Sequence, residues 1–107
     1  MFVKNVRARA KYSPLKMGKT DLVKSEKLFA GLNSLEPGQE HALHAHEGQE
    51  KMYFVLEGSG EVQIGETTET LGPGDMAFAP CGVPHAVRNP GPERLLVMVV
   101  MGLPPGK

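Results

Sequence analysis

The chain has 107 residues, of which 40% are hydrophobic, and its 12 Lys and Arg residues balance 12 Asp and Glu residues. This length fits one small domain with one core. The balanced charge excludes a net positive electrostatic potential that would attract nucleic acid, an anionic membrane or an acidic partner. Cys81 is the only cysteine, which also excludes an internal disulfide framework and a multi-cysteine zinc cluster.

Short segments rich in Val, Phe, Leu and Thr lie between 13 glycines and 9 prolines, a pattern that predicts an all-β barrel or sandwich. The first 25 residues are more polar, and we expect residues 1–25 to form an arm that wraps the outside of a barrel core at about residues 26–101. The whole chain, 1–107, is then a single domain. The expected strands are 27–35, 40–46, 52–56, 61–64, 67–71, 76–79, 85–89 and 94–101.

The segment "EVQIGETTETL" predicts a β-hairpin with Gly65 and Glu66 in its tight turn, because such turns require a residue that tolerates positive φ. The later run "LLVMVVMGL", 95–103, is continuously apolar, which indicates burial on both faces of a strand and favours a homodimer. It is far shorter than the roughly 20 residues of a membrane helix. We therefore expect a cytoplasmic protein that binds neither nucleic acid nor membrane.

Three of the four histidines lie at positions 41, 44 and 46. Residues two apart on a strand project from the same face, so His44 and His46 are expected to aim their imidazoles at one point. His41 is three residues before His44 and would fall on the opposite face of a continuous strand, so we expect it to be a surface or edge histidine. A His-x-His pair alone is a weak indication of metal binding.

A second element strengthens the metal hypothesis. In "GDMAFAPCGVPHAVRN" the last histidine, His85, follows a Pro-x-Gly turn and begins an expected strand. Three neutral imidazoles on rigid strands would provide half of the coordination shell of a divalent transition metal.

These residues resemble the two signatures of the cupin superfamily. Gly38-x5-His44-x-His46 followed by "VLEG" resembles the first signature, and Gly74-x5-Pro80-x-Gly82-x2-His85-x3-Asn89 matches each fixed position of the second. The resemblance implies a small RmlC-like domain of the cupin type 2 conserved-barrel kind. Such a domain is a double-stranded β-helix, or jelly-roll barrel, with one metal inside, and the resemblance also points to a homodimer.

The sequence departs from the commonest family pattern at the fourth ligand. A glutamate is expected five positions after the second histidine, and this chain has Lys51 there. An ammonium has no lone pair to offer a metal. Two neighbours compete for the role: Glu50 brings charge, whereas strand register favours Gln49 if Tyr53 faces the interior. A bulge at Gly48 would reverse that preference, and a site completed by water stays open.

The metal site is thus predicted as His44, His46, His85 and Gln49, with Glu50 as the alternative to Gln49, holding one Fe, Mn, Ni, Zn or Cu ion. The first function hypothesis is a metal-dependent enzyme for a small chelating molecule, either dioxygenase-like or isomerase-like, and the candidates for catalytic residues are Glu50 and Tyr53. The alternative is a non-catalytic protein that binds or senses a sugar or carboxylate. Cys81, four residues before His85, is either a reactive thiol or a small buried hydrophobe.

Overall fold

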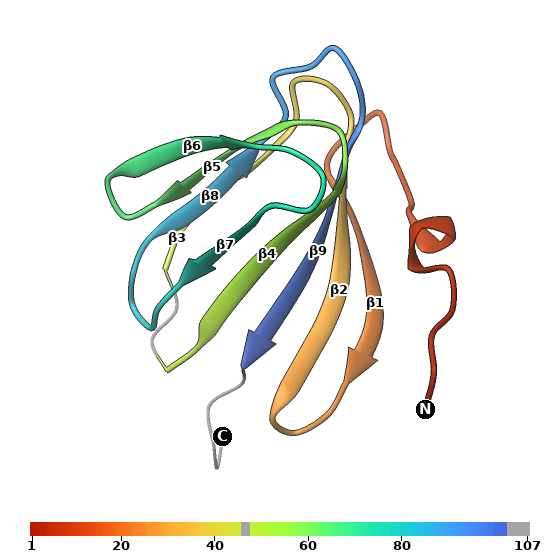
Figure 1. Cartoon of the computed structure of the whole chain (residues 1–107), viewed down its shortest axis with the longest axis vertical. Helices are drawn as coiled ribbons and strands as arrows, with labels where there is room; N and C mark the ends of the chain where they lie inside the picture. The colour runs from red at the N-terminus through yellow and green to blue at the C-terminus, as the bar shows by residue number, and fades with distance from the viewer. Residues whose placement is uncertain (46–47, 103–107) are drawn as a thin grey trace.

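The structure is a computed structural model that describes residues 1–45 and 48–102. All of its strand pairs are antiparallel, and they form two sheets, a longer one of five strands and a shorter one of four (Figure 1). The described elements are the 3-10 helix η1 (Val6–Arg9) and the strands β1 (Gly18–Lys24), β2 (Leu28–Leu35), β3 (Glu40–His44), β4 (Glu50–Glu57), β5 (Gly60–Ile64), β6 (Thr67–Leu71), β7 (Met76–Ala79), β8 (His85–Arg88) and β9 (Leu95–Gly102).

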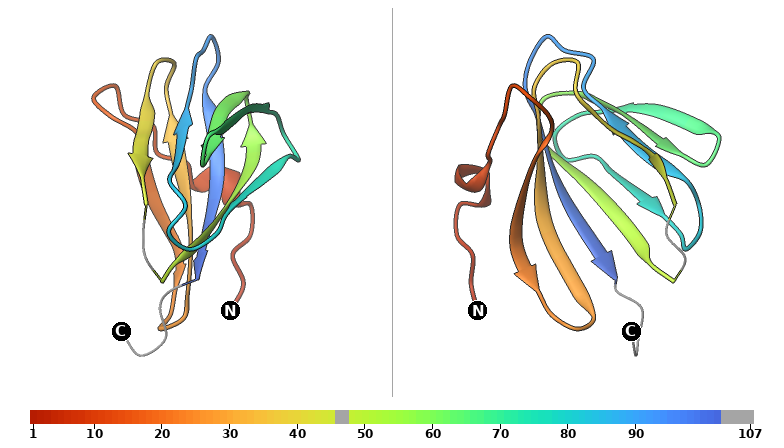
Figure 2. Two further views of the ribbon diagram at one scale, coloured as in Figure 1. Left: turned by 90° about the vertical axis from the view of Figure 1, so that its left-hand side faces the viewer. Right: turned by 180° about the vertical axis from the view of Figure 1, so that it is seen from behind.

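The strand orders are β1-β2-β9-β4-β7 in the longer sheet and β3-β8-β5-β6 in the shorter. The side and back views show the two sheets as the two layers of one molecule (Figure 2). This is a single all-β domain with the jelly-roll arrangement predicted from the sequence. The apolar core lies between the layers, where its fully buried members include Leu35, Tyr53, Val55, Val87 and Val97.

The predicted strands are confirmed to within two residues at each end. The hairpin of β5 and β6 has the predicted turn: Ile64 pairs with Thr67, and Gly65 has φ of 61°. Residue 46, the last of one predicted strand, lies outside the described residues. Strand β1 was not predicted. Three of the seven residues in "GKTDLVK" are charged, and these polar side chains hide the apolar–polar alternation by which a strand is recognised.

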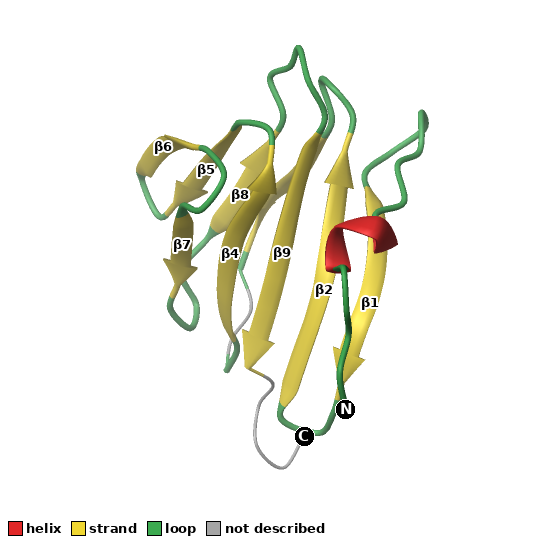
Figure 3. Ribbon diagram, turned by 45° about the vertical axis from the view of Figure 1, so that its right-hand side comes forward, coloured by secondary structure: helices red, strands yellow, loops and turns green. Residues whose placement is uncertain are grey.

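The segment before β1 packs on the outer face of the longer sheet. Figure 3 shows η1 in front of β1 and β2, and the backbone amide of Lys11 donates a hydrogen bond to Ser34 Oγ at 3.1 Å. Ser34 pairs with Leu96 across β2 and β9, and both side chains are fully buried. The predicted two-sided burial of β9 is therefore found at Leu95, Leu96 and Val97.

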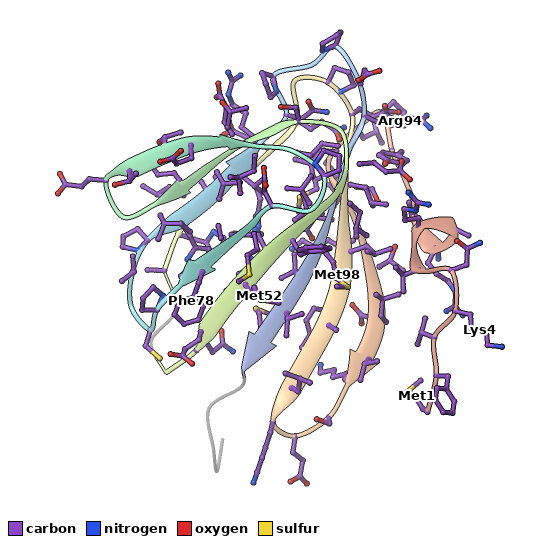
Figure 4. All side chains as sticks on the ribbon, in the orientation of Figure 1. Met1, Lys4, Met52, Phe78, Arg94 and Met98 are labelled. Atoms are coloured by element: carbon purple, nitrogen blue, oxygen red, sulfur yellow. The ribbon has the colours of Figure 1, made fainter. Side chains whose placement is uncertain are left out.

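Apolar side chains remain exposed farther along the same outer face. Met52 pairs with Phe78 across β4 and β7, and Phe54 pairs with Met76. Met76 and Phe78 are 54% and 48% exposed. In Figure 4 the labelled side chains of Met52 and Phe78 lie close together on these strands. We refer to Met52, Phe54, Met76 and Phe78 as the outer apolar patch.

Candidate metal centre

His44 and His85 face each other from adjacent strands. They are directly paired in the register of β3 and β8, and their ring centroids are 4.2 Å apart. The Nδ1 atom of His44 lies 2.7 Å from the carbonyl oxygen of Ala42, and that of His85 lies 3.0 Å from the carbonyl oxygen of Val83. Because a carbonyl only accepts, each Nδ1 carries a proton, which leaves the buried Nε2 as the ring nitrogen that a neutral imidazole would offer to a metal.

This arrangement suits metal ligation. Metal-binding histidines in proteins usually donate the second ring N–H to a carbonyl or carboxylate, which fixes the tautomer and the orientation of the ring. Both imidazoles have that support from the backbone of their own chain segment, two residues before each histidine. The donor set of His44 and His85 therefore fits a transition metal, and both were predicted as ligands. The third predicted imidazole, that of His46, lies outside the described residues.

The two candidates for the fourth ligand take different positions. Strand β4 is regular from Glu50 to Val55, with Lys51, Tyr53 and Val55 buried and Glu50 exposed. The side chain of Glu50 is therefore on the outer face, as the register argument expected. Gln49 precedes the strand and is half-buried. Gly48 has φ of 75°, but the backbone turn it makes comes before β4 and leaves the strand's register unchanged.

His41 lies on β3, an edge strand of the shorter sheet, as the expectation of a surface or edge histidine allowed, but its expected place on the opposite face from His44 is wrong. A register shift separates the pairs His41–Val87 and His44–His85, so β3 has one more residue than β8 over this interval. Such a β-bulge turns His41 to the same face as His44, and their ring centroids lie 4.2 Å apart. Its buried Nδ1 has no hydrogen-bond partner among the residues described. The bulge has no glycine to mark it in "EHALH".

The environment of His41 keeps its ring neutral. Burial, then the positive charges of Lys51 and neighbouring groups, lower the pKa of His41 from 6.5 to about 4. At neutral pH the imidazole of His41 is therefore uncharged and can offer a lone pair. Sequence reasoning missed His41 because it assumed a continuous strand.

Lys51 occupies the position where the family pattern has a carboxylate, and its side chain points inward. It is only 6% exposed, and its Nζ lies 4.9 Å from the centroid of the Tyr53 ring. Burial, followed by the nearby charge of Lys19, lowers the pKa of Lys51 from 10.5 to about 8. The side chain is still mostly protonated at neutral pH, so it cannot serve as a metal ligand.

Tyr53 is fully buried beside the histidines, with its ring centroid 6.0 Å from that of His85. Its hydroxyl group has no hydrogen-bond partner within the described parts of the chain. Burial raises the pKa of Tyr53 above its usual value of 10. The phenol is therefore neutral at neutral pH, and it can donate a hydrogen bond but gives up its proton less readily than an exposed tyrosine.

A cavity of about 450 Å³ opens at this end of the molecule. His41, His44 and Lys51 line one part of it, and residues of β1, β2 and β9 line the rest. Among residues 1–45 and 48–102 no group of three His, Cys, Asp or Glu side chains is arranged to hold a metal ion. Cys81 is exposed, so its interpretation as a buried hydrophobe is wrong.

Comparison with known protein families agrees with the fold and the histidine pattern. The family model described as Cupin domain matches residues 31–101. The chain belongs to the cupin family. Its matched segment contains the paired histidines His44 and His85 and most of the residues around the cavity.

Three similar proteins indicate the range of this cupin's relatives. The oxalate-binding protein of Thermotoga maritima is 32% identical over 70% of this chain and 61% of its own length. The 5-nitrosalicylic acid 1,2-dioxygenase of a Bradyrhizobium species is 32% identical over 68% of this chain and 35% of its own length. The crystal structure of TT1209 from Thermus thermophilus has a TM-score of 0.93 and 42% identity, and the match covers 98% of this chain and 100% of that one.

The chain thus spans less than two thirds of the length of each of these two relatives, so their full activities are not transferred to this cupin. Within the described residues, no helix has the length and hydrophobicity needed to cross a membrane.

Proposed function

We propose that this cupin binds one divalent transition metal and uses it to act on a small chelating molecule. The observation that carries the proposal is the pair His44 and His85, whose Nδ1 protons are bound by backbone carbonyls and whose buried Nε2 atoms face the interior. Metal-binding imidazoles usually have such support, because it fixes the tautomer and the orientation of the ring. The names of the oxalate-binding and dioxygenase relatives support the same class of function.

The proposed ligands are His44, His46, His85 and Gln49, and the ion is Fe, Mn, Ni, Zn or Cu. Glu50 is the weaker candidate because it is exposed on the outer face of β4. An ion held by neutral imidazole and amide groups keeps its full formal charge, and it would supply Lewis-acid or redox chemistry to a bound ligand. The neutral ring of His41 is close enough to His44 to orient that ligand or to join the shell.

For catalysis, the two candidates among the described residues, Tyr53 and Glu50, provide a hydrogen-bond donor more readily than a base. The phenol of Tyr53 is neutral and buried, so its part is to donate a hydrogen bond to an oxygen of the ligand. The other candidate, Glu50, faces outward. Since neither candidate provides a base, a dioxygenase-like or isomerase-like reaction would draw its base from another residue such as the neutral ring of His41, from the ligand or from metal-bound solvent.

The outward position of Glu50 favours a second candidate function, a non-catalytic protein that binds or senses a sugar or carboxylate. Such a protein needs a cavity and a metal but no general base. The relative named as an oxalate-binding protein supports this alternative.

Metal binding is tested on protein purified without an affinity tag. We expect about one equivalent of a transition metal by elemental analysis, and a rise in melting temperature when Mn²⁺, Fe²⁺, Ni²⁺ or Zn²⁺ is added to chelator-treated protein. His44→Ala and His85→Ala should abolish that rise, and Gln63→Ala, on the neighbouring strand β5, should retain it. An equal response of wild-type protein and His44→Ala to every metal would contradict the proposal.

Oxygen uptake and product formation with small diols, diketones and keto acids distinguish an enzyme from a binding protein. Turnover by metal-loaded protein that is lost in Tyr53→Phe with metal content unchanged would support the enzyme. Binding of these compounds without turnover under every metal would support the non-catalytic candidate.

We also propose a homodimer that forms through the outer apolar patch in the reducing environment of the cytoplasm. The exposure of Met76 and Phe78 supports the dimer, and the exposed free thiol of Cys81 suits a reducing compartment. Light scattering after size exclusion should give twice the chain mass, and Phe78→Glu should give the mass of one chain. A monomeric wild-type protein at micromolar concentrations would contradict the dimer.

A further inference from the structure

Lys51 is a buried cation without a carboxylate partner in the described parts of the chain. The ion pairs that the structure describes are Arg7–Glu57, Arg88–Glu61 and Arg94–Glu36, and all of them lie near the surface. Lys51 is buried by comparison, and its described contact is with the face of the Tyr53 ring. Removing an ammonium from water is costly unless an opposite charge or strong hydrogen bonds compensate it.

The position of Lys51 is fixed by its strand and not by chance packing. Lys51 pairs with Met101 of β9 on one side and with Ala79 of β7 on the other, so it lies on an interior strand of the longer sheet. Its neighbours on the inner face of β4, Tyr53 and Val55, are fully buried. An apolar residue such as Met would fill this position at lower cost, so a buried lysine here needs a compensating role.

The cavity beside Lys51 has two kinds of wall. One wall is polar and is formed by Lys19 and Asn33, which pair across β1 and β2. The positive charge of Lys19 is close enough to lower the pKa of Lys51. Phe29, Val99 and Met101 provide an apolar surface. The described lining also includes Asp21, which is exposed on the edge strand and forms no described ion pair with Lys51.

We propose that Lys51 binds the carboxylate of a small organic acid whose apolar part lies against Phe29, Val99 and Met101. The ammonium and carboxylate form a charge-assisted hydrogen bond in a site sheltered from water, which such pairs require to be strong. The cavity of about 450 Å³ is the size of pockets that hold small molecules. The inference deepens the proposed function and rests on it for the location of the ligand, because His44 lines the same cavity. Binding of the carboxylate by the ammonium does not itself require the metal.

The test uses the full chain at pH 7, stripped of metal with a chelator and then exchanged into metal-free, chelator-free buffer, so that neither metal nor the chelator's own carboxylates contribute. Benzoate and acetate are titrated against their neutral isosteres benzamide and acetamide, with binding followed by amide chemical shifts and by melting temperature. The variants are Lys51→Met, Lys51→Arg and the control Lys27→Met, which removes an exposed lysine in the turn between β1 and β2.

We expect the carboxylates to bind wild-type protein and Lys27→Met at least about tenfold more tightly than the amides, since a charge-assisted hydrogen bond is worth this much. Lys51→Met should lose that preference, and Lys51→Arg should keep part of it. Should Lys51→Met fail to fold, Lys51→Gln provides the same neutral comparison. Equal affinity for acid and amide in wild-type protein, no carboxylate binding, or an unchanged preference in the neutral variant would overturn the inference.

The outcome is separable from that of the proposed function. Carboxylate selectivity of the metal-free protein, combined with a failure of every metal to bind, would retain the role of Lys51 and remove the metal proposal. Metal binding that requires His44, without carboxylate selectivity, would do the reverse.

Discussion

The ammonium of Lys51 lies 4.9 Å from the centroid of the Tyr53 ring, and Lys51 lines the same cavity as His41 and His44. A cation over an aromatic face gains some electrostatic stabilisation, but less than it loses by leaving water when it is this deeply buried. The pair therefore marks a position where the chain gives up stability, and such positions concentrate at functional sites.

Lys51→Met should stabilise the metal-free protein at neutral pH, and the gain should shrink in alkali. The folded-state pKa of Lys51 is about 8 and its unfolded value is 10.5, so between these pH values the unfolded chain binds more protons. The stability of the wild-type protein therefore rises relative to Lys51→Met as the pH increases from 8 to 10.5, by on the order of 2 kcal/mol.

Urea denaturation of both proteins in EDTA across this alkaline range, with a reference at neutral pH, measures the difference. Lys27→Met, with its exposed lysine removed, should follow the wild-type curve. A constant stability difference between wild type and Lys51→Met across this range would show that the buried ammonium does not titrate as proposed.

Asn89→Ala should destabilise the fold by about 2 to 4 kcal/mol, because a fully buried amide that makes three hydrogen bonds is lost. Asn89 Nδ2 donates to the carbonyl oxygens of Leu35 and Glu93 at 2.9 and 2.8 Å, and Oδ1 accepts from the amide of Gly91 at 2.8 Å. Thermal and urea unfolding measure the loss. Arg88→Ala, one residue earlier and exposed, is the control and should change stability by less than about 1 kcal/mol.

Two glycines with positive φ should respond differently to substitution by alanine. Gly38 and Gly58 have φ of 89° and 82°, so both variants incur backbone strain of about 1 kcal/mol. A Cβ at Gly38 meets open space, whereas one at Gly58 would collide with the carbonyl oxygen of Arg94. Gly58→Ala should therefore unfold at a clearly lower urea concentration than Gly38→Ala. Equal midpoints would argue against the close approach of Gly58 to Arg94.

The sequence predicted the strands and the signature histidines because both depend on local patterns. Glycine and proline mark the strand ends, and His44 and His85 occupy fixed positions within two short signatures. It also placed Glu50 on the outer face, because alternation along β4 follows from the burial of Tyr53 and Val55. These inferences require no knowledge of how distant segments pack.

The features that the sequence did not reveal depend on pairing between strands. The bulge that brings His41 beside His44 arises from the register of β3 against β8, and "EHALH" has no residue that marks it. Strand β1 is held by its pairing with β2, against the weak propensity of "GKTDLVK". The burial of Lys51 depends on the position of β4 between β7 and β9, which the sequence does not show. No described ion pair gives Lys51 a carboxylate partner.

The choice between Gln49 and Glu50 as a metal ligand yields the last prediction. Glu50 is exposed on the outer face of β4, and Gln49 is half-buried just before the strand begins. Glu50→Gln should therefore leave the affinity for Mn²⁺ or Ni²⁺ unchanged, and Gln49→Ala should weaken it by about tenfold or more, as expected for loss of one group of a metal site.

Isothermal titration of chelator-treated protein with each metal provides the measurement, and His44→Ala sets the level expected when a proposed imidazole ligand is lost. A large loss of affinity in Glu50→Gln with little change in Gln49→Ala would place the carboxylate in the site. It would also require the start of β4 to rotate on metal binding, since the register of Glu50 with Gly102 turns this side chain away from Lys51 and the cavity. Equal, small effects of both variants would leave three imidazoles and solvent as the coordination shell.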